Sequence, residues 1–226
     1  MLSAVMEDYL KAIYTLQVEG DGEQVRTSQI ADYLDVTSPS VTSMLDKLES
    51  RDLIDREKYS GVELTPDGER VALEVIRHHR LIEAYLTEHL DYPWSEVHEE
   101  ADRLEHHISE AFEERVAAAL DDPEVDPHGS PIPNVDLEPP AERTGTSLSE
   151  HEEGATVTVA EVSDRDPSVL EYLSDHGVNP GVELTVVEVA PFGMYTVKPA
   201  GRDGTVSLPE DVASSVRVSS TVELES

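Results

Sequence analysis

The sequence predicts a mainly α-helical protein that ends in a small β-barrel. Apolar residues recur with a helical period through about the first 120 residues, a proline-rich stretch follows, and β-branched residues alternate with polar ones from Ala155 onward. A chain of 226 residues is long enough for two or three small domains. We therefore expect a multidomain protein divided into residues 1–65, 66–122, 123–150 and 151–226.

The formal net charge is −33, and only four of the sixteen basic residues are lysine. Such a surface normally repels DNA. In molar salt, however, the Debye length falls to about 3 Å, so self-repulsion is screened while carboxylates keep the surface hydrated. The composition therefore indicates adaptation to a salty cytoplasm and a halophilic source. An acidic disordered protein is the alternative, and the periodic apolar pattern argues against it.

Charge is unevenly distributed. Residues 1–80 carry nine Lys/Arg against sixteen Asp/Glu, a net charge of −7, and residues 81–226 carry seven against thirty-three, a net charge of −26. The N-terminal third is therefore the part least hostile to an anion. The sequence has no apolar run long enough to span a membrane and no signal-peptide pattern, so we expect a cytoplasmic protein without a membrane partner.

The first element expected is a helix over residues 3–18, ended by Gly20-Asp21-Gly22. A short helix over 26–34 follows, capped by Thr27 or Ser28, and then a tight turn. A third helix over 37–49 has proline in its first turn and Val41, Leu45 and Leu48 on its buried face. Two short helices joined in this way suggest a helix-turn-helix.

The exposed start of the third helix carries small polar residues and a proline that could reach phosphates or base edges. Residues 53–64 form two strand-like runs, which predicts a wing with basic residues beside it. The candidate DNA-binding residues are Thr37, Ser38, Pro39, Ser40, Thr42, Ser43, Arg51, Arg56 and Lys58. The plainer alternative is that the hydroxyl groups only cap a solvated helix.

Two long amphipathic helices are expected next, over residues 66–90 and 95–120. They carry more apolar surface than one another can cover. In a protein that binds DNA, the partner that covers it is expected to be a second copy of the chain.

These two helices also carry a candidate metal site. Asp102, Glu105 and His106 have the i, i+3, i+4 spacing that places two carboxylates and an imidazole on one helical face. Such a set suits manganese or iron, whereas calcium prefers oxygen alone and structural zinc favours cysteine, which the chain lacks. His79 and Glu83 form a second i, i+4 pair. A solvated acidic helix face is the alternative.

Residues 121–150 contain six of the fourteen prolines, which predicts a linker. Its prolines could adopt polyproline II and dock on the barrel, or the segment could be a bare spacer. Beyond it, strands are expected at 156–162, 182–189, 195–197 and 205–208, with a short helix over 168–175.

In this order of elements, the chain resembles the diphtheria toxin repressor family of metal-dependent transcriptional regulators, over nearly its whole length. The segments that carry the resemblance are Met6-Glu-Asp-Tyr-Leu-Lys-Ala-Ile-Tyr14, Thr37-Ser-Pro-Ser-Val-Thr-Ser43, Arg77-His-His-Arg-Leu-Ile-Glu83, Val97-His-Glu-Glu-Ala-Asp-Arg-Leu-Glu-His106 and Gly129-Ser-Pro-Ile-Pro133. The resemblance implies a winged-helix domain, a helical metal-binding and dimerisation domain, and an SH3-like (FeoA-type) barrel.

The resemblance also implies two metal sites per subunit. The regulatory ion falls on Asp8, Asp102, Glu105 and His106, and the second ion on His79, Glu83 and His98, with Glu171 of the barrel as a further candidate. The manganese-responsive branch resembles this chain in its carboxylates at Asp8 and Asp102, where the iron-responsive branch looks sulfur-bearing. The manganese branch often lacks the barrel, so Mn(II) and Fe(II) both remain open.

The expected function is a homodimeric repressor of metal-uptake and homeostasis genes that binds an inverted-repeat operator when Mn(II) or Fe(II) is bound. One alternative is a winged-helix regulator whose histidine-bearing helices serve only dimerisation. A metal-dependent hydrolase is a further alternative, but the sequence has no His-Glu-x-x-His run and no glycine-rich phosphate loop. No enzyme activity is therefore expected.

Overall fold

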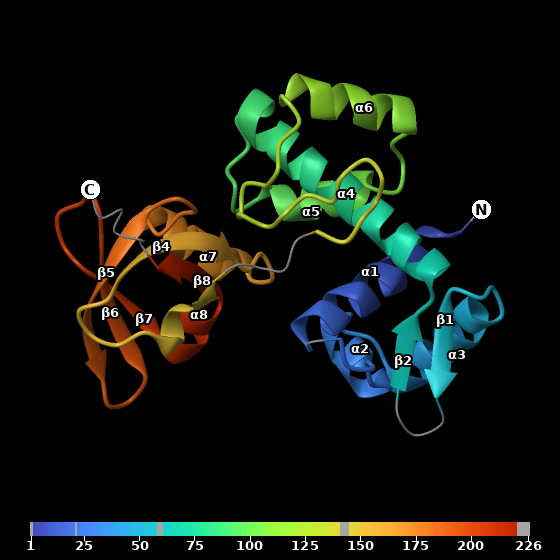
Figure 1. The fold of residues 1–226 in the computed structure, drawn as a ribbon, viewed down its shortest axis with the longest axis horizontal. Coiled ribbons are helices and arrows are strands. Elements are labelled where there is room, and N and C mark those ends of the chain that lie inside the picture. The colour runs from blue at the N-terminus through green and yellow to red at the C-terminus, as the bar shows by residue number, and fades with distance from the viewer. Residues whose placement is uncertain (1, 21, 58–60, 141–144, 221–226) are drawn as a thin grey trace. The chain divides into compact units, whose positions relative to one another are not determined.

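The computed structural model describes residues 2–20, 22–57, 61–140 and 145–220 (Figure 1). By its internal contacts the chain divides into two compact units. The first comprises Met1–His79, Leu104–Glu110 and Pro133–Pro139, and the second Arg80–Arg103, Ala111–Ile132 and Pro140–Ser226. Within the described residues, no helix is both long and apolar enough to cross a membrane.

The winged helix predicted from the sequence is present in the first unit. It contains α1 (Ala4–Glu19), α2 (Thr27–Tyr33) and α3 (Ser38–Glu49), followed by the antiparallel strands β1 (Ile54–Glu57) and β2 (Gly61–Leu64). Their apolar faces form one core, in which Leu10, Ile13, Ile30, Leu45 and Leu48 are fully buried. The N-cap of α2 is Arg26 rather than the predicted Thr27 or Ser28, because the Gln29 side chain accepts from the Arg26 amide at 2.9 Å.

The long helix α4 (Pro66–Leu90) begins where the sequence predicts. Gly68 lies in its first turn, where an added Cβ would lie 1.9 Å from the Leu53 carbonyl oxygen. Only glycine permits this close approach between the helix and the end of the winged helix.

The prediction of a single helix over residues 95–120 is wrong. The structure has two shorter helices, α5 (Val97–Leu104) and α6 (Glu110–Ala119), separated by a turn and an irregular stretch. Ser109 directly precedes α6, and serine is a residue that favours helix starts over helix interiors. The helical spacing assumed for Asp102, Glu105 and His106 therefore does not hold beyond Leu104.

In the proline-rich segment before the β domain, residues 126–132 are folded and packed, so this part is not a bare spacer. The Asp126 amide donates to the Ser130 carbonyl, and the Asp126 carboxylate accepts from the His128 and Ser130 amides. Ile132 packs in a core with residues of α4 and α6. Asp126, His128 and Ser130 are buried. At Gly129 the φ angle is +88°, and an added Cβ would lie 2.0 Å from the Ala160 carbonyl oxygen, so this loop packs tightly on the following strand.

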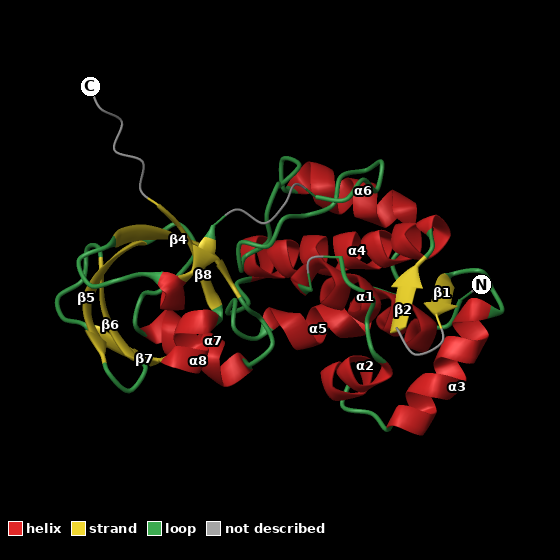
Figure 2. Ribbon diagram, turned by 60° about the horizontal axis from the view of Figure 1, so that its bottom comes forward, coloured by secondary structure: helices red, strands yellow, loops and turns green. Residues whose placement is uncertain are grey.

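The β domain is built on a six-stranded antiparallel sheet, separate from the two-stranded sheet of the wing (Figure 2). The strand order is β3-β8-β4-β5-β6-β7. The strands and helices are β3 (Thr146–Ser147), a 3-10 turn (Leu148–Glu150), β4 (Thr156–Val162), α7 (Pro167–Asp175), β5 (Glu183–Ala190), β6 (Met194–Pro199), β7 (Val206–Pro209), α8 (Glu210–Ser214) and β8 (Val216–Ser220).

Four predicted strands and the short helix are confirmed, whereas β3, β8 and α8 were not predicted. The sheet encloses a core in which Leu148, Leu170, Leu173 and Leu184 are fully buried. The predicted barrel is not closed by hydrogen bonds between the described strands, because β3 and β7 lie at the two ends of the strand order.

Candidate metal centres and nucleic-acid interface

The first candidate metal centre joins the N-terminal helix to the turn that follows α5. Asp8 lies on the second turn of α1, and His106 approaches it with Nε2 2.8 Å from Asp8 Oδ1. The other ring nitrogen, Nδ1, lies 2.7 Å from Glu7 Oε2. The turn after Leu104 therefore brings an imidazole to two consecutive carboxylates of α1, although 98 positions separate it from Asp8 in the sequence.

Glu105 completes this cluster from the same turn. Its Oε1 lies 3.3 Å from His106 Nε2, and its Oε2 lies 2.6 Å from His79 Nδ1 on α4. The His78 ring also contacts the Glu105 backbone carbonyl at 3.1 Å, which fixes the turn itself. Ligand atoms of Asp8, Glu105 and His106 all lie within 4.8 Å of one another. Two carboxylates and an imidazole fit a hard divalent cation such as Mn(II) or Fe(II).

The carboxyl groups of this cluster differ in their electrostatics. Burial raises the pKa of Asp8, and the neighbouring His106 only partly offsets that rise. Burial also acts to raise the pKa of Glu105, but the hydrogen bond with His79 and the charge of Lys11 outweigh it, so the pKa of Glu105 is lowered. Glu105 is thus an ionised carboxylate held inside the protein.

Asp102 lies on α5 with its side chain 48% exposed, and its Oδ2 is 3.6 Å from His98 Nε2. The prediction that Asp102, Glu105 and His106 share one helical face is wrong, because α5 ends before Glu105. Within α5, Asp102 pairs with His98, the histidine one helical turn earlier.

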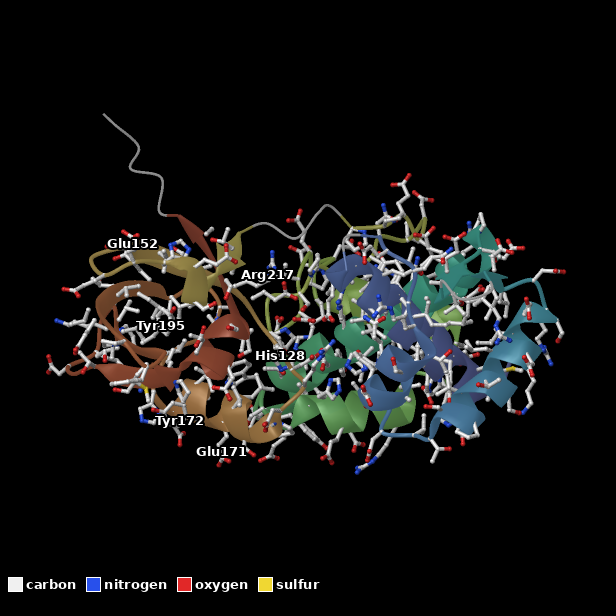
Figure 3. All side chains as sticks on the ribbon, turned by 90° about the horizontal axis from the view of Figure 1, so that it is seen from below. His128, Glu152, Glu171, Tyr172, Tyr195 and Arg217 are labelled. Carbon is white, nitrogen blue, oxygen red and sulfur yellow. The ribbon has the colours of Figure 1, made fainter. Side chains whose placement is uncertain are left out.

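A second candidate centre surrounds Glu83, which is fully buried on α4 one turn after His79. Its Oε1 lies 3.3 Å from Nδ1 of His98, a residue that the family resemblance assigns to the same site. The same His98 nitrogen lies 3.3 Å from Asp164 Oδ2, in the segment between β4 and α7. Asp164 was not predicted. The predicted barrel residue, Glu171, is exposed on α7 (Figure 3) and belongs to none of the candidate metal clusters among the described residues.

Two further buried residues face Glu83 from the loop before the β domain. His128 Nδ1 lies 3.5 Å from Glu83 Oε2 and 4.0 Å from Asp126 Oδ1, and the three residues form a fully buried potential ligand set. The other His128 nitrogen donates to the Trp94 carbonyl at 2.8 Å, which orients the ring. One signal was present, an aspartate two residues before a histidine in a proline-rich stretch, but without helical spacing nothing linked these residues to Glu83.

Burial and charge strongly perturb this second set. Burial, reinforced by the charge of Glu83, raises the pKa of Asp126 to about 7. Burial alone would lower the pKa of His128, but its pairing with Glu83 and the charge of Asp126 raise it to about 9. In the metal-free protein a proton on His128 therefore partly neutralises the two carboxylates.

The candidate DNA-binding surface lies at the start of α3. All six predicted residues of this helix and its N-cap, from Thr37 to Ser43 except the buried Val41, are exposed. Thr37 and Ser40 bond to each other through their hydroxyl oxygens at 2.9 Å, and the Thr42 hydroxyl donates to the Ser38 carbonyl. Pro39 stands in the first turn, as predicted.

The basic residues near the wing differ in their surroundings. Arg51 is exposed just after α3, whereas the Arg56 guanidinium on β1 lies 2.5 Å from Asp46 and 3.6 Å from Glu49. Arg56 must therefore leave or share these carboxylates to contact a phosphate. Lys58 lies outside the described residues.

A winged helix followed by buried carboxylate and histidine clusters defines a metal-responsive, DNA-binding regulator of transcription. Three family models match the chain in the same order: the iron dependent repressor N-terminal DNA binding domain over residues 1–62, the iron dependent repressor metal binding and dimerisation domain over 65–134, and the FeoA domain over 146–220. The chain belongs to the diphtheria toxin repressor family. It is a repressor by family and not an enzyme.

Relatives match over nearly the full length. The iron-dependent repressor IdeR of Mycobacterium tuberculosis is 35% identical over 223 residues, which cover 94% of this chain and 95% of the relative. The diphtheria toxin repressor of Corynebacterium diphtheriae is 29% identical over 221 residues, covering 94% and 95%.

Solved structures confirm the fold. A manganese-dependent transcriptional repressor in complex with manganese has a TM-score of 0.85 and 36% identity, covering 95% of this chain and 99% of the other. The manganese regulator SloR has a TM-score of 0.78 at 36% identity, covering 95% and 98%.

Proposed function

We propose that this chain is a homodimeric repressor of metal-uptake genes, activated by Mn(II) or Fe(II) and binding an inverted-repeat operator. The observation that carries the proposal is the contact between Asp8 on α1 and His106 after α5, at 2.8 Å. An ion held there joins the first helix of the DNA-binding domain to the turn after α5. Metal then favours one arrangement of these elements, by as much as it binds that arrangement more tightly.

Asp8, Glu105 and His106 would hold the regulatory ion, with Asp102 as the fourth ligand that the family resemblance implies. The ion supplies positive charge that neutralises the carboxylates and links the elements carrying them. Oxygen and imidazole are donor types that suit Mn(II) and Fe(II) better than softer metals. By the Irving–Williams order, however, later metals such as copper bind more tightly, so affinity alone does not select manganese. Mn(II) is our first candidate because Asp8, Glu105 and His106 supply oxygen and nitrogen donors.

A second ion in each subunit is supported by the buried set around Glu83. Either His79 and His98, as the sequence suggests, or Asp126 and His128 would complete its ligands. Burial does not choose between the two sets, because His79 is 3% exposed, Asp126 is 5% exposed and His128 is 0% exposed. Asp164 is the candidate ligand from the β domain.

Dimer formation follows from the apolar surface and from the size of a DNA site. Leu90 at the end of α4 and Phe112 on α6 are 53% and 48% exposed, within a segment that matches a dimerisation domain. One recognition helix buries too little surface for specific affinity, so two copies on two half-sites are required. The operator is therefore expected to be an inverted repeat.

The proposal is tested by measuring operator binding while Mn(II) is titrated. Asp8→Ala should leave the protein folded but abolish manganese-stimulated binding, because the link from α1 to His106 is lost. Asp8→Met, which introduces a soft thioether, should shift activation from manganese towards iron or cobalt. Asp32→Ala is the matched control, since it removes an exposed aspartate from α2.

If Asp8→Ala keeps the wild-type manganese response, the cluster of Asp8, Glu105 and His106 is not the switch. In that event Glu83→Gln, tested in the same titration, would decide whether the second centre controls DNA binding. A regulator that binds its operator equally with and without metal would support the alternative in which these histidines serve only dimerisation.

A further inference from the structure

Lys11 places a positive charge directly on the first candidate metal centre. It lies on α1 one helical turn after Asp8, and its Nζ is 2.8 Å from Glu105 Oε2 and 3.0 Å from His79 Nδ1. Because His79 Nδ1 is itself 2.6 Å from the same Glu105 oxygen, the three polar atoms form a closed triangle. The other oxygen of Glu105 faces His106.

The triangle accounts for a carboxylate that is otherwise costly to bury. The Glu105 side chain is only 1% exposed, and burying an ionised carboxylate requires a close opposite charge. The Lys11 side chain is 18% exposed, so its stem is largely covered while its ammonium reaches the buried oxygen. The charge of Lys11 is one of the interactions that lower the pKa of Glu105.

We propose that Lys11 is the resident cation of the metal-free protein, and that its ammonium competes with the activating ion for the Glu105 carboxylate. This inference rests on the proposed function, because it assigns the same cluster to the metal. A divalent ion held by Asp8, Glu105 and His106 shares Glu105 with a fixed positive charge, and like charges at such short range repel even when partly screened. Lys11 thereby sets the metal concentration at which the repressor responds.

Competition makes a specific prediction about affinity. Replacing Lys11 by a neutral side chain should tighten Mn(II) binding, because the metal no longer shares Glu105 with an ammonium group. It should also destabilise the metal-free protein, because Glu105 loses its counter-charge. If Lys11 instead serves to orient Glu105 for the metal, the same change should weaken Mn(II) binding.

The test measures the Mn(II) dissociation constant of the full-length protein in molar potassium chloride, from the electron paramagnetic resonance signal of free Mn(II). Lys11→Gln keeps a hydrogen-bond donor without the charge, Lys11→Met removes both, and Lys11→Arg keeps the charge. Lys47→Met removes an exposed lysine from α3 and controls for the loss of one positive charge from an acidic protein.

We expect Lys11→Gln to lower the dissociation constant about tenfold, a change worth about 1.4 kcal/mol, and Lys11→Arg and Lys47→Met to stay within about twofold of the wild type. The melting temperature of metal-free Lys11→Gln should fall, while the rise on adding Mn(II) should exceed that of the wild type. If Lys11→Met fails to fold, Lys11→Gln decides the question.

An unchanged or raised dissociation constant in Lys11→Gln overturns the proposed competition. The proposed function fails separately, if Asp8→Ala leaves Mn(II) binding unchanged. If Asp8→Ala weakens Mn(II) binding and Lys11→Gln leaves it unchanged, the metal site stands and the role of Lys11 is wrong.

Discussion

His128 is a fully buried histidine whose ring faces two carboxylates, those of Glu83 and Asp126. Its pKa of about 9 lies above the ordinary value of 6.5, so the folded state favours the protonated ring. This contribution to stability is fully present below about pH 6.5 and is lost as the pH rises through about 9. The raised pKa of Asp126, about 7, acts in the same direction, because folding favours its protonated form.

The pH dependence of metal-free stability tests this arrangement. With chelator present, His128→Gln should lower the melting temperature by about 3–6 °C near pH 6, and the difference from the wild type should shrink towards zero by about pH 9.5. The reason is that the wild type itself loses the proton that pairs with the carboxylates. The measurement is thermal unfolding followed by circular dichroism.

His151→Gln provides the control for this series, because His151 lies in the β domain, away from Glu83, and its ring contacts only the Thr146 hydroxyl among the contacts described. A constant difference between wild type and His128→Gln at every pH would mean that His128 stabilises by packing rather than by charge.

At the scale of single elements, the loop from Asp126 to Ile132 fixes the second candidate centre through its close approach to β4. The Val162 amide donates to the His128 carbonyl at 2.9 Å, and the Ser130 hydroxyl donates to the buried Glu161 carboxylate at 2.6 Å. Gly129, between these two residues, has no room for a side chain. The loop and the strand are therefore one packed element of the second unit.

Gly129 and Gly154 have nearly the same positive φ angle, so comparing them distinguishes backbone strain from steric collision at Gly129. Gly154 has a φ of +90° with no atom within 4 Å of an added Cβ, whereas at Gly129 the Cβ would meet the Ala160 carbonyl oxygen. We expect Gly154→Ala to cost about 1 kcal/mol and Gly129→Ala about 3 kcal/mol or more in the free energy of unfolding by denaturant. Equal losses would show that the loop can move away from β4 at little cost.

The recognition helix α3 carries a second prediction at this scale. Pro39→Ala and Ser40→Ala should weaken binding to the operator more than to random DNA, because these residues are exposed at the helix start that we expect to meet base edges. Fluorescence anisotropy on both DNAs measures the ratio. Ser28→Ala, on the exposed face of α2, is the control. An equal loss of affinity for both DNAs would mean that Pro39 and Ser40 contact phosphates or support folding and do not read bases.

The elements predicted well from sequence are those with a strong local period. The winged helix, α4 and the strands β4 to β7 each repeat apolar residues at a helical or alternating spacing. The break between α5 and α6 was missed because the apolar pattern of Val97, Ala101, Leu104 and Ile108 continues across it. The period of apolar residues reports only local preference. It cannot show that the chain is stabilised more by contacts of His106 with α1 than by a further turn of α5.

The candidate site was predictable only in part, for the same physical reason. Glu105 and His106 were identified by their spacing and Asp8 through the family resemblance, and the structure brings the three together. Asp126, His128 and Asp164 stand in irregular segments, where spacing carries no information about direction. Their proximity to Glu83 or His98 arises from tertiary packing of a loop that composition alone marks as a linker.

At the scale of the whole molecule, the charge of −33 governs how the protein meets DNA. We predict that operator binding survives molar potassium chloride, with a shallow or positive slope of log affinity against log salt. Counterion release from DNA weakens as a driving force in concentrated salt, and the acidic surface can take up cations on binding. Anisotropy measured at several salt concentrations gives the slope, and a steep negative value would show that the charge adaptation does not extend to the DNA interface.

The chain contains one tryptophan, and it stands beside the second candidate centre. The Trp94 indole donates to the Ser174 hydroxyl of α7 at 2.8 Å, its carbonyl accepts from His128, and the two rings lie 5.4 Å apart. Any event that moves or discharges His128 therefore alters the surroundings of the only indole in the protein. The molecule carries an intrinsic optical reporter, so its emission spectrum can follow this centre in an unlabelled, unmodified chain.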